Sequence, residues 1–366
     1  MKIFLIIPSF RGGGAERVFI DLADLLSRSN YEVTLVSLSG EGEYSNSLPE
    51  GLSVKVLGTG GVKNSFFALV KLLKNCDPDI IISALTHVNI AVVIASFMAK
   101  SKAKVIVTEH NPYSIEKRAL SLPIRFALFI GCFCTYRLAS KVVAVSKGVK
   151  TSLIKALHLK PETIKVIYNP INIDRVRTLA ASEIYAKQDI PTLVTMGRLV
   201  RQKRHDVLLK AFARVCTQQK PMRLLIYGDG PLLSELMDLA ERLHIKDNVQ
   251  FLGFADNPFS AIANSDGFVL SSEFEGFGNV LVEALALGIP IVSTNCEVGP
   301  AEILDNGRYG LLSKEGSVES FANCLETLIF NHDFDKLKLQ TRAEQFSPNH
   351  ALENYQSLFK SMNIDG

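Results

Sequence analysis

The segment 267–284 constrains the fold of this chain most strongly, because it joins a buried strand to a helix through a glycine turn. Residues 267–270 form a short apolar run, as expected of a buried strand, and Gly276-Phe277-Gly278 supplies the turn. A helix that starts directly after such a turn presents backbone N–H groups and a positive dipole end to an anion. The segment therefore predicts an α/β fold with an anion site at a strand end.

Two carboxylates flank this turn. Glu275 lies in the loop, and Glu283 lies about one turn into the helix. A carboxylate this close to a helix start is poorly suited to bind phosphate itself, but it accepts hydrogen bonds from hydroxyls such as those of a ribose or a hexose. An anion site beside hydroxyl-binding carboxylates indicates a nucleotide sugar.

Composition excludes several other classes of protein. The chain has 366 residues, of which 47% are hydrophobic and 21% charged, which suits two domains with substantial cores. A net charge of +3 argues against a nucleic-acid binder. The six cysteines show no repeated spacing, so we expect neither a zinc site nor a disulfide framework. The apolar start is too short for a signal peptide and no run reaches the length of a membrane span, so we expect a cytoplasmic protein with at most peripheral membrane contact.

Both halves of the chain alternate short apolar runs with helical patterns. Continuous Ile, Val and Leu runs separated by helices indicate parallel sheets covered on both faces. The turn-forming run 169–174 and the polar stretch up to Pro191 separate the halves, and a strand at 192–196 restarts the pattern. The sequence therefore predicts two doubly wound domains with ligand sites at the carboxyl ends of their strands.

The signature segment also carries a family resemblance. The run Glu-Gly-Phe-Gly-x4-Glu-Ala at 275–284, followed by Leu-Gly-Ile-Pro at 287–290, resembles the signature of retaining glycosyltransferases of family 4, which have the GT-B fold. The resemblance implies two Rossmann-like domains facing across a cleft. These are an acceptor-binding domain at 1–174, a nucleotide-sugar-binding domain at 175–350, and a last helix at 351–366 that crosses back to the first domain.

The same resemblance assigns roles within the signature. It implies that Glu283 holds the ribose hydroxyls and that Glu275, as a catalytic residue, holds the sugar hydroxyls. Asn279 and Val280 would supply backbone N–H groups to the diphosphate. The turn residues that complete this part of the site are Gly276, Phe277 and Gly278.

A basic loop follows the first strand of the second half. Arg198 and Lys203 are close enough to converge on one diphosphate, with Arg as a planar fork and Lys as a point charge. A solvated basic loop is the plainer interpretation of these residues alone. The family resemblance favours the diphosphate, and we assign catalytic roles to both residues, because fixed cations stabilise a leaving diphosphate. No Asp-x-Asp motif stands where a metal-dependent transferase needs it, so we predict transfer without a metal or other cofactor.

A glycine-rich turn opens the first helix of the chain. Gly13 and Gly14 follow the first strand, but the dinucleotide pattern G-x-G-x-x-G fails here, and a tight turn for close packing explains the same letters. The run Gly-Gly-Ala-Glu-Arg resembles the opening of family members that extend lipid-linked oligosaccharides. That resemblance places Gly13, Gly14 and Arg17 beside the acceptor and the donor phosphates.

His110 lies just after the carboxyl end of a buried strand that we predict over 104–108. A single histidine is more often structural than catalytic, but ligands of α/β sheets bind at carboxyl strand ends. The family has a histidine near this place that contacts the donor sugar, and we assign this role to His110, with Glu109 as second choice.

Two further loops remain open between a structural and a ligand-binding role. Gly228 and Gly230 form either a tight connection or the Gly-x-Gly loop that lines the nucleotide pocket in the family. Glu302 lies in a Gly-Pro-x-Glu-Ile run that is similar to one in lipid-linked oligosaccharide transferases, where it would help to position the base or the loop.

Two segments are candidates for contact with a membrane. Residues 118–138 form an apolar stretch with basic ends, too short to span a bilayer, which fits either an interfacial helix or a buried one. Lys63, Lys71 and Lys74 fall on one face of a predicted helix, which is either solvated or in contact with anionic lipid.

Together these features predict a glycosyltransferase at the inner face of the plasma membrane. It would move a hexose or N-acetylhexosamine from a nucleotide donor, UDP by resemblance, to a hydroxyl of a polysaccharide or polyprenyl-diphosphate-linked glycan, with retention. The expected partners are thus the donor, the glycan acceptor and an anionic membrane surface, without nucleic acid. Two alternatives remain: a nucleotide-sugar epimerase of the same fold, which needs no acceptor, and a non-catalytic sugar-binding protein.

Overall fold

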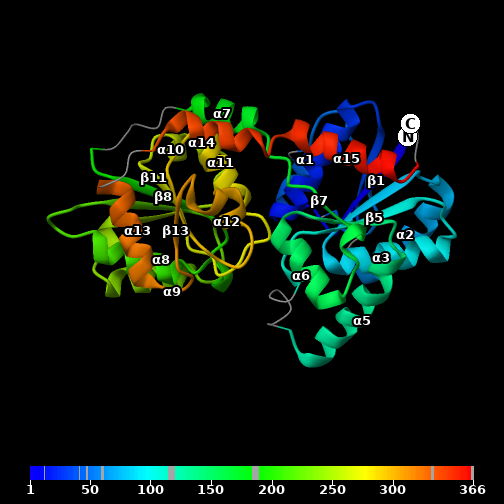
Figure 1. The fold of residues 1–366 in the computed structure, drawn as a ribbon, viewed down its shortest axis with the longest axis horizontal. Coiled ribbons are helices and arrows are strands. Elements are labelled where there is room, and N and C mark those ends of the chain that lie inside the picture. Colours follow the sequence, from blue (N-terminus) through cyan, green and yellow to red (C-terminus); the bar gives the residue numbers. More distant parts are fainter. Residues whose placement is uncertain are drawn as a thin grey trace. The chain divides into compact units, whose positions relative to one another are not determined.

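The structure is a computed structural model that describes residues 1–11, 13–40, 42–46, 48–58, 62–113, 120–183, 189–330 and 334–363, without the side chains of residues 62 and 63. The chain forms two compact units, traced from blue to red in Figure 1. The first unit comprises 1–170 and 348–366, and the second comprises 171–347. The predicted boundaries, after residues 174 and 350, lie close to these divisions.

The first unit contains a seven-stranded sheet whose pairings are all parallel, in the order β3-β2-β1-β4-β5-β6-β7. Its strands are β1 (Lys2–Ile7), β2 (Glu32–Ser37), β3 (Ser53–Val56), β4 (Ile80–Ala84), β5 (Lys104–Glu109), β6 (Lys141–Ala144) and β7 (Ile164–Val166). Its helices are α1 (Gly14–Arg28), α2 (Val62–Cys76), α3 (Thr86–Ala99), α5 (Leu122–Leu138), α6 (Lys147–Leu157) and α15 (Pro348–Ser361).

Helices cover both faces of this sheet, because successive strand residues point to opposite sides and both sets are apolar. One cluster gathers Ile3, Leu5 and Ile7 of β1 with apolar residues of α1 and with Tyr355 and Phe359 of α15. Figure 1 shows α1 and α15 on one face of the sheet and α2 and α3 on the other. The last helix of the chain is therefore part of the core of the first unit.

The second unit repeats the arrangement with a six-stranded parallel sheet in the order β10-β9-β8-β11-β12-β13. Its strands are β8 (Thr192–Met196), β9 (Arg223–Tyr227), β10 (Val249–Gly253), β11 (Gly267–Leu270), β12 (Ile291–Thr294) and β13 (Leu311–Ser313). Its helices are α7 (Ile173–Ser182), α8 (His205–Val215), α9 (Leu233–Arg242), α10 (Phe259–Ala263), α11 (Asn279–Leu287), α12 (Pro300–Ile303), α13 (Val318–Phe330) and α14 (Lys336–Glu344).

The strand order of each sheet reverses once, between β1 and β4 in the first unit and between β8 and β11 in the second. Such reversal points leave a crevice at the carboxyl ends of the two strands, where open α/β sheets bind ligands. The predicted fold class, two doubly wound α/β units, is confirmed. Within the described ranges, no helix is both long and apolar enough to cross a bilayer.

Candidate donor site

The basic loop and the acidic turn leave the sheet side by side. β8 and β11 are hydrogen-bonded neighbours in parallel register, with Leu193 opposite Gly267. The loop after β8 carries Arg198 and Lys203, and the turn after β11 carries Glu275. Because parallel strands end at the same edge, the two loops meet at the reversal point of the second sheet, which is its expected ligand crevice.

Lys203 and Glu275 contact each other directly. Lys203 Nζ donates to Glu275 Oε1 at 2.6 Å, and Ser272 Oγ donates to the same oxygen at 2.6 Å. The side chains of Lys203 and Glu275 are only 18% and 10% exposed. A charge-assisted pair with this little exposure holds both side chains in fixed positions.

Main-chain and side-chain bonds tie the two loops together around this pair. Gln202 Nε2 donates to the carbonyl of Phe274 at 2.9 Å, and the N–H of Glu273 donates to the carbonyl of Gln202 at 2.8 Å. Ser271 Oγ donates to the carbonyl of Lys203 at 2.8 Å. The loop that carries the cation and the turn that carries the carboxylate therefore form one rigid assembly.

Helix α11 begins beside the pair and faces the same edge. Gly278 is its cap residue and has a φ of 103°, a left-handed conformation that favours glycine. Asn279 and Val280 are its first two residues, and Glu283 follows on the face of Asn279, half-buried. The backbone N–H groups of a helix start suit an anion, and the carboxylate one turn further in suits hydroxyls attached to that anion.

The loop after β9 packs backbone to backbone against the basic loop. Gly228 has a φ of 129°, and a Cβ there would lie 2.1 Å from the carbonyl oxygen of Gly197. A Cβ at Gly230 would lie 2.5 Å from the carbonyl oxygen of Leu199, whose N–H is bonded to the carbonyl of Asp229. Packing alone therefore requires both glycines, and it supports the loop that carries the exposed Arg198.

Replacing Gly228 with alanine is expected to destabilise the second unit by about 3 kcal/mol or more, because the new Cβ meets backbone that has no room to move. Gly316→Ala is the matched control, since Gly316 also has a positive φ of 68° but open space around it. We expect that variant to lose only about 1 kcal/mol. Urea unfolding followed by circular dichroism measures both, and equal losses would contradict the packing role.

His110 lies in the first unit, directly after β5, and its hydrogen bonds assign its tautomer. Thr108 Oγ1 donates its one proton to the carbonyl of Ser83 at 2.7 Å, and it also lies 3.2 Å from His110 Nε2. The Thr108 hydroxyl can therefore only accept from the ring, so Nε2 carries the proton and Nδ1 is an acceptor. Burial lowers the pKa of His110 to about 4, so the ring is neutral at physiological pH.

Glu109 points into a buried polar network. Its carboxylate accepts hydrogen bonds from Tyr136 of α5 and from Asn89 and Thr86 of α3. Asn89 Nδ2 also donates to the carbonyl of Thr108 at 2.8 Å. The network holds the end of β5 in place, and His110 with it.

Two buried histidines make the folded state sensitive to acid. Burial lowers the pKa of His110 and of His205 at the start of α8 to about 4 each. The histidine pKa in the unfolded chain is about 6.5, so the unfolded chain binds more protons than the folded protein between pH 6.5 and 4. The contribution of the two neutral histidines to the free energy of unfolding is therefore fully present above pH 6.5 and is lost as the pH falls to 4. The loss is at most about 3 kcal/mol for each histidine.

Replacing His205 with leucine is expected to reduce this acid sensitivity by about half, since the two shifts are alike. Its Nδ1 is buried without a hydrogen-bond partner among the described residues, so little is lost at pH 7. Urea unfolding at pH 7.5 and pH 5 tests this, with His350→Leu at an exposed histidine as the control. An unchanged difference between the two pH values would contradict the role of His205.

Gly13, Gly14 and Arg17 also lie in the first unit, at the start of α1. Gly13 is the amino-terminal cap, and the carboxylate of Glu16 folds back over it. Arg17 Nε pairs with Asp21, one turn further along the helix, at 3.1 Å. Phe19 of the same helix packs edge-on against the His110 ring, with the two ring centroids 5.7 Å apart.

Sequence reasoning missed Ser272, which is fully buried and shares Glu275 Oε1 with Lys203. Its backbone carbonyl accepts from Thr294 Oγ1 at the end of β12. Two serines directly after an apolar strand are the available signal.

Glu302 lies on α12, partly buried, and its carbonyl accepts from Arg342 Nη2 at 2.7 Å.

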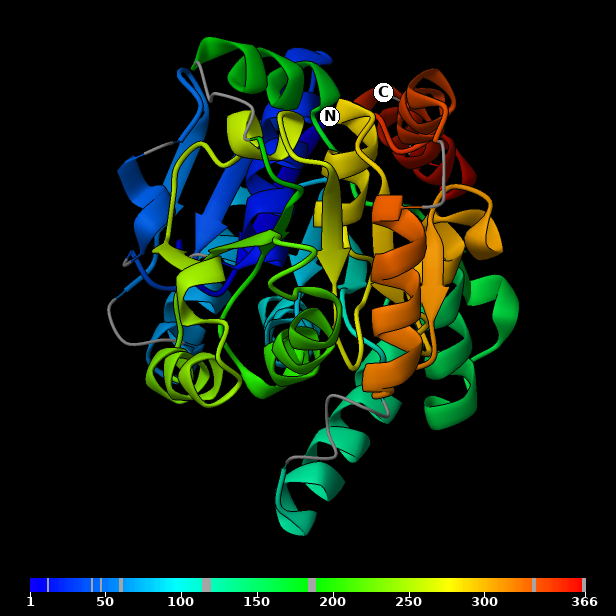
Figure 2. The same ribbon diagram turned by 90° about the vertical axis from the view of Figure 1, so that its left-hand side faces the viewer.

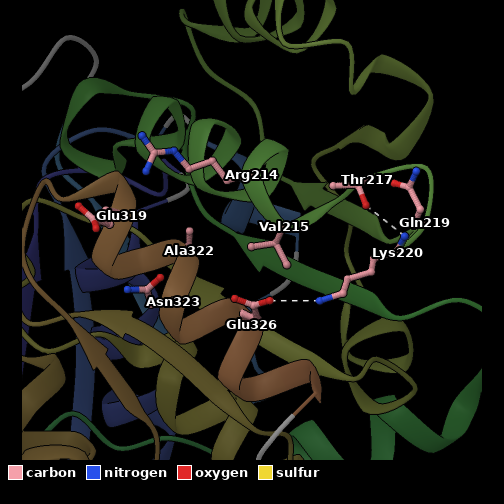
Figure 3. A pocket seen from close by; sticks show the side chains of 9 residues that line it. All are labelled: Arg214, Val215, Thr217, Gln219, Lys220, Glu319, Ala322, Asn323 and Glu326. Carbon is pink, nitrogen blue, oxygen red and sulfur yellow. Dashed lines mark hydrogen bonds and ion pairs between the residues drawn. The ribbon is translucent and has the colours of Figure 1, made fainter.

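A cavity of about 370 Å³ lies away from these loops, between α8 and α13 (Figure 3). It lies beside the end of α8 and the segment that leads into β9. This is the edge of the sheet opposite to the carboxyl ends of the strands. Lys220 and Glu326 in its wall pair at 3.2 Å. It therefore belongs to another surface than the donor site.

Among the described residues, no three His, Cys, Asp or Glu side chains are gathered as metal ligands would be.

Two sequence families match almost the whole chain. The family described as Glycosyltransferase Family 4 matches residues 12–175, and the family described as Glycosyl transferases group 1 matches residues 180–347. The chain belongs to family 4 of the glycosyltransferases, and the fold of its two units is GT-B.

Relatives match the chain over nearly its full length. It is 29% identical over 362 residues to the N-acetylgalactosamine-N,N'-diacetylbacillosaminyl-diphospho-undecaprenol 4-alpha-N-acetylgalactosaminyltransferase of Campylobacter jejuni, covering 94% of this chain and 95% of that protein. It is 26% identical to the lipopolysaccharide 1,6-galactosyltransferase of Escherichia coli, covering 90% and 89%. The structure of Anabaena HepE in complex with UDP-glucose has a TM-score of 0.82 at 24% identity and covers 98% of this chain and 100% of that one.

Proposed function

We propose that this glycosyltransferase moves a hexose or N-acetylhexosamine from a UDP-sugar to a hydroxyl of a lipid-linked glycan or a growing polysaccharide, with retention. One observation carries the proposal: a Lys203–Glu275 pair fixed at 2.6 Å beside the start of α11, at the reversal point of the second sheet. The arrangement offers cations and helix N–H groups for a diphosphate and carboxylates for hydroxyls within one rigid assembly.

Each residue then has a separate task. Arg198 and Lys203 stabilise the negative charge that develops on the leaving diphosphate, together with the N–H groups of Asn279 and Val280. Glu283 accepts from the ribose hydroxyls and Glu275 from the sugar hydroxyls. Lys203 and Ser272 both donate to Oε1 of Glu275, so Oε2 is the oxygen we assign to the sugar.

His110 acts as a neutral hydrogen-bond acceptor in this proposal. With the proton on Nε2 and the pKa near 4, its Nδ1 accepts from a hydroxyl but does not donate to phosphate. This favours a contact with the sugar over one with the diphosphate. Retention follows the family, and no side chain is assigned as a covalent nucleophile.

We propose that no metal takes part, because two fixed cations and a helix start supply the charge stabilisation that a divalent ion would otherwise give. The acceptor is proposed from the relatives, two of which are named for acting on an undecaprenol-linked glycan and on lipopolysaccharide. A lipid-linked acceptor would hold the protein, as a peripheral protein, at the inner face of the plasma membrane.

A transfer assay tests the proposal. UDP-hexoses and UDP-N-acetylhexosamines carrying a radiolabelled sugar are incubated in EDTA with polyprenyl-diphosphate-linked glycans, and label is counted in the lipid phase. We expect label transfer with one donor, and nuclear magnetic resonance of the product should show the donor's anomeric configuration. Interconversion of free UDP-sugars without an acceptor would favour the epimerase, and tight UDP-sugar binding with neither reaction would favour a sugar-binding protein.

A further inference from the structure

Three helices of the first unit, α2, α3 and α5, form one continuous surface. α2 packs against α3, and α3 packs against α5. The sequence of the three helices contains no Asp or Glu. An ordinary solvated helix surface mixes both signs of charge, whereas the charged side chains of these three helices are all basic.

The outer side of this surface is apolar. Phe97 of α3 is 80% exposed and Phe126 of α5 is 66% exposed. The exposed large apolar side chains of the three helices are Phe67, Ile94, Phe97, Met98, Leu122, Ile124, Phe126, Ile130, Phe133 and Leu138. Isolated exposed apolar residues are normal, but ten on three adjacent helices mark an interaction surface.

Helix α5 is anchored at its carboxyl-terminal half and projects at its amino-terminal half. A Cβ at Gly131 would lie 2.9 Å from Ile90 Cδ1, so this glycine allows the helix to lie closely on α3. Beyond it, Cys132, Thr135 and Tyr136 are buried. Residues 121–127 are all exposed, and Figure 2 shows this part of α5 reaching away from the unit. Two helical turns that expose their apolar side chains are marginal in water.

The same helices also expose cations. Lys71 and Lys74 of α2, Lys100 at the end of α3 and Arg125 of α5 are all exposed. Arg137 differs, because its guanidinium caps the carbonyls of Phe133 and Leu157. The predicted lysine face of α2 thus belongs to this surface, although the side chain of Lys63 lies outside the described residues.

We infer that the surface formed by α2, α3 and the projecting half of α5 docks on an anionic lipid bilayer, with Phe97 and Phe126 in the acyl boundary and the cations on the headgroups. Apolar side chains with basic residues around them and no acid are the chemistry of an interfacial helix surface. A second copy of the chain fits less well, because a two-fold interface would bring the same positive charges together. The buried interpretation of α5 is excluded for its amino-terminal half.

Vesicle co-sedimentation of the full chain tests the inference. The protein is expected to bind vesicles of phosphatidylcholine with phosphatidylglycerol more tightly than pure phosphatidylcholine. The double substitution Phe97→Glu and Phe126→Glu is expected to weaken binding by about tenfold or more, because both charges would enter the acyl boundary. Since both residues are exposed, the variant should keep the thermal stability of the wild type.

Phe254→Glu in the second unit is the matched control, since Phe254 is 63% exposed and lies on none of the three helices. It should bind vesicles like the wild type. Equal binding of the double variant and the wild type, or equal binding to both kinds of vesicle, would overturn the inference. So would a wild-type dimer in light scattering that the double substitution dissociates, if the wild type binds no vesicles.

The inference rests on the membrane location in the proposed function and deepens it, because it names the surface that meets the bilayer, but the two experiments are separable. Vesicle binding needs neither donor nor acceptor, and sugar transfer to a detergent-dissolved acceptor needs no vesicle. A failure of one experiment therefore leaves the other to be judged alone.

Discussion

Replacing Glu275 with glutamine is expected to lower kcat by about 10²- to 10³-fold while the protein remains folded. The carboxylate of Glu275 holds Lys203 and Ser272 through one oxygen, and it accepts from the sugar through the other in our account. The amide keeps the shape but loses the charge that pairs with Lys203. It also presents an NH₂ group where the carboxylate accepted a hydrogen bond.

Glu273→Gln is the control, because Glu273 lies two residues earlier in the same turn and is partly exposed. We expect its kcat and KM to remain within about twofold of the wild type. Initial rates at saturating donor, together with thermal unfolding of both variants, separate catalysis from folding. Near-normal turnover of Glu275→Gln would remove Glu275 from the site.

Replacing Arg198 with glutamine is expected to lower kcat/KM by about 10²-fold, because a guanidinium that pairs with the leaving diphosphate contributes about 3 kcal/mol to the transition state. The residue is exposed and its loop is held by backbone packing, so the free energy of unfolding should change by less than about 0.5 kcal/mol. The loss should therefore be one of catalysis and not of stability.

Arg201→Gln tests whether position matters beyond charge, since Arg201 is equally basic, exposed and only three residues further along the same loop. We expect this control to retain wild-type kcat/KM. If both variants lose activity to the same extent, the loop acts through its overall charge, and the specific role of Arg198 is wrong.

The strand, turn and helix units could be predicted from sequence because each carries its own local signal. Apolar runs such as Ile80-Ile81-Ile82 predict strands buried on both faces, and Gly278 predicts the left-handed turn before α11. Strand ends that carry polar residues then predict a site. That the loops after β8 and β11 are neighbours depends on the strand order, which short-range patterns do not contain.

Other parts required the structure because they depend on contacts between distant residues. In the sequence, Gly228 looks like an ordinary turn residue. Only the short distance from its would-be Cβ to the carbonyl oxygen of Gly197 shows why a side chain is excluded. Ser272 has no motif of its own, and its role follows from the carboxylate that it contacts. The composition of α5 fits a buried or an interfacial helix equally, and its exposure distinguishes the two.

The measurement that tests the central claim most directly is calorimetric titration of the protein with UDP, GDP and ADP in EDTA, for the wild type and for Glu283→Ala. The account predicts that UDP binds the wild type, that GDP and ADP bind more weakly, and that Glu283→Ala weakens UDP binding by about tenfold or more through loss of the ribose contact. Absence of binding by all three nucleotides, or UDP binding that Glu283→Ala leaves unchanged, would contradict a nucleotide-sugar site at the start of α11.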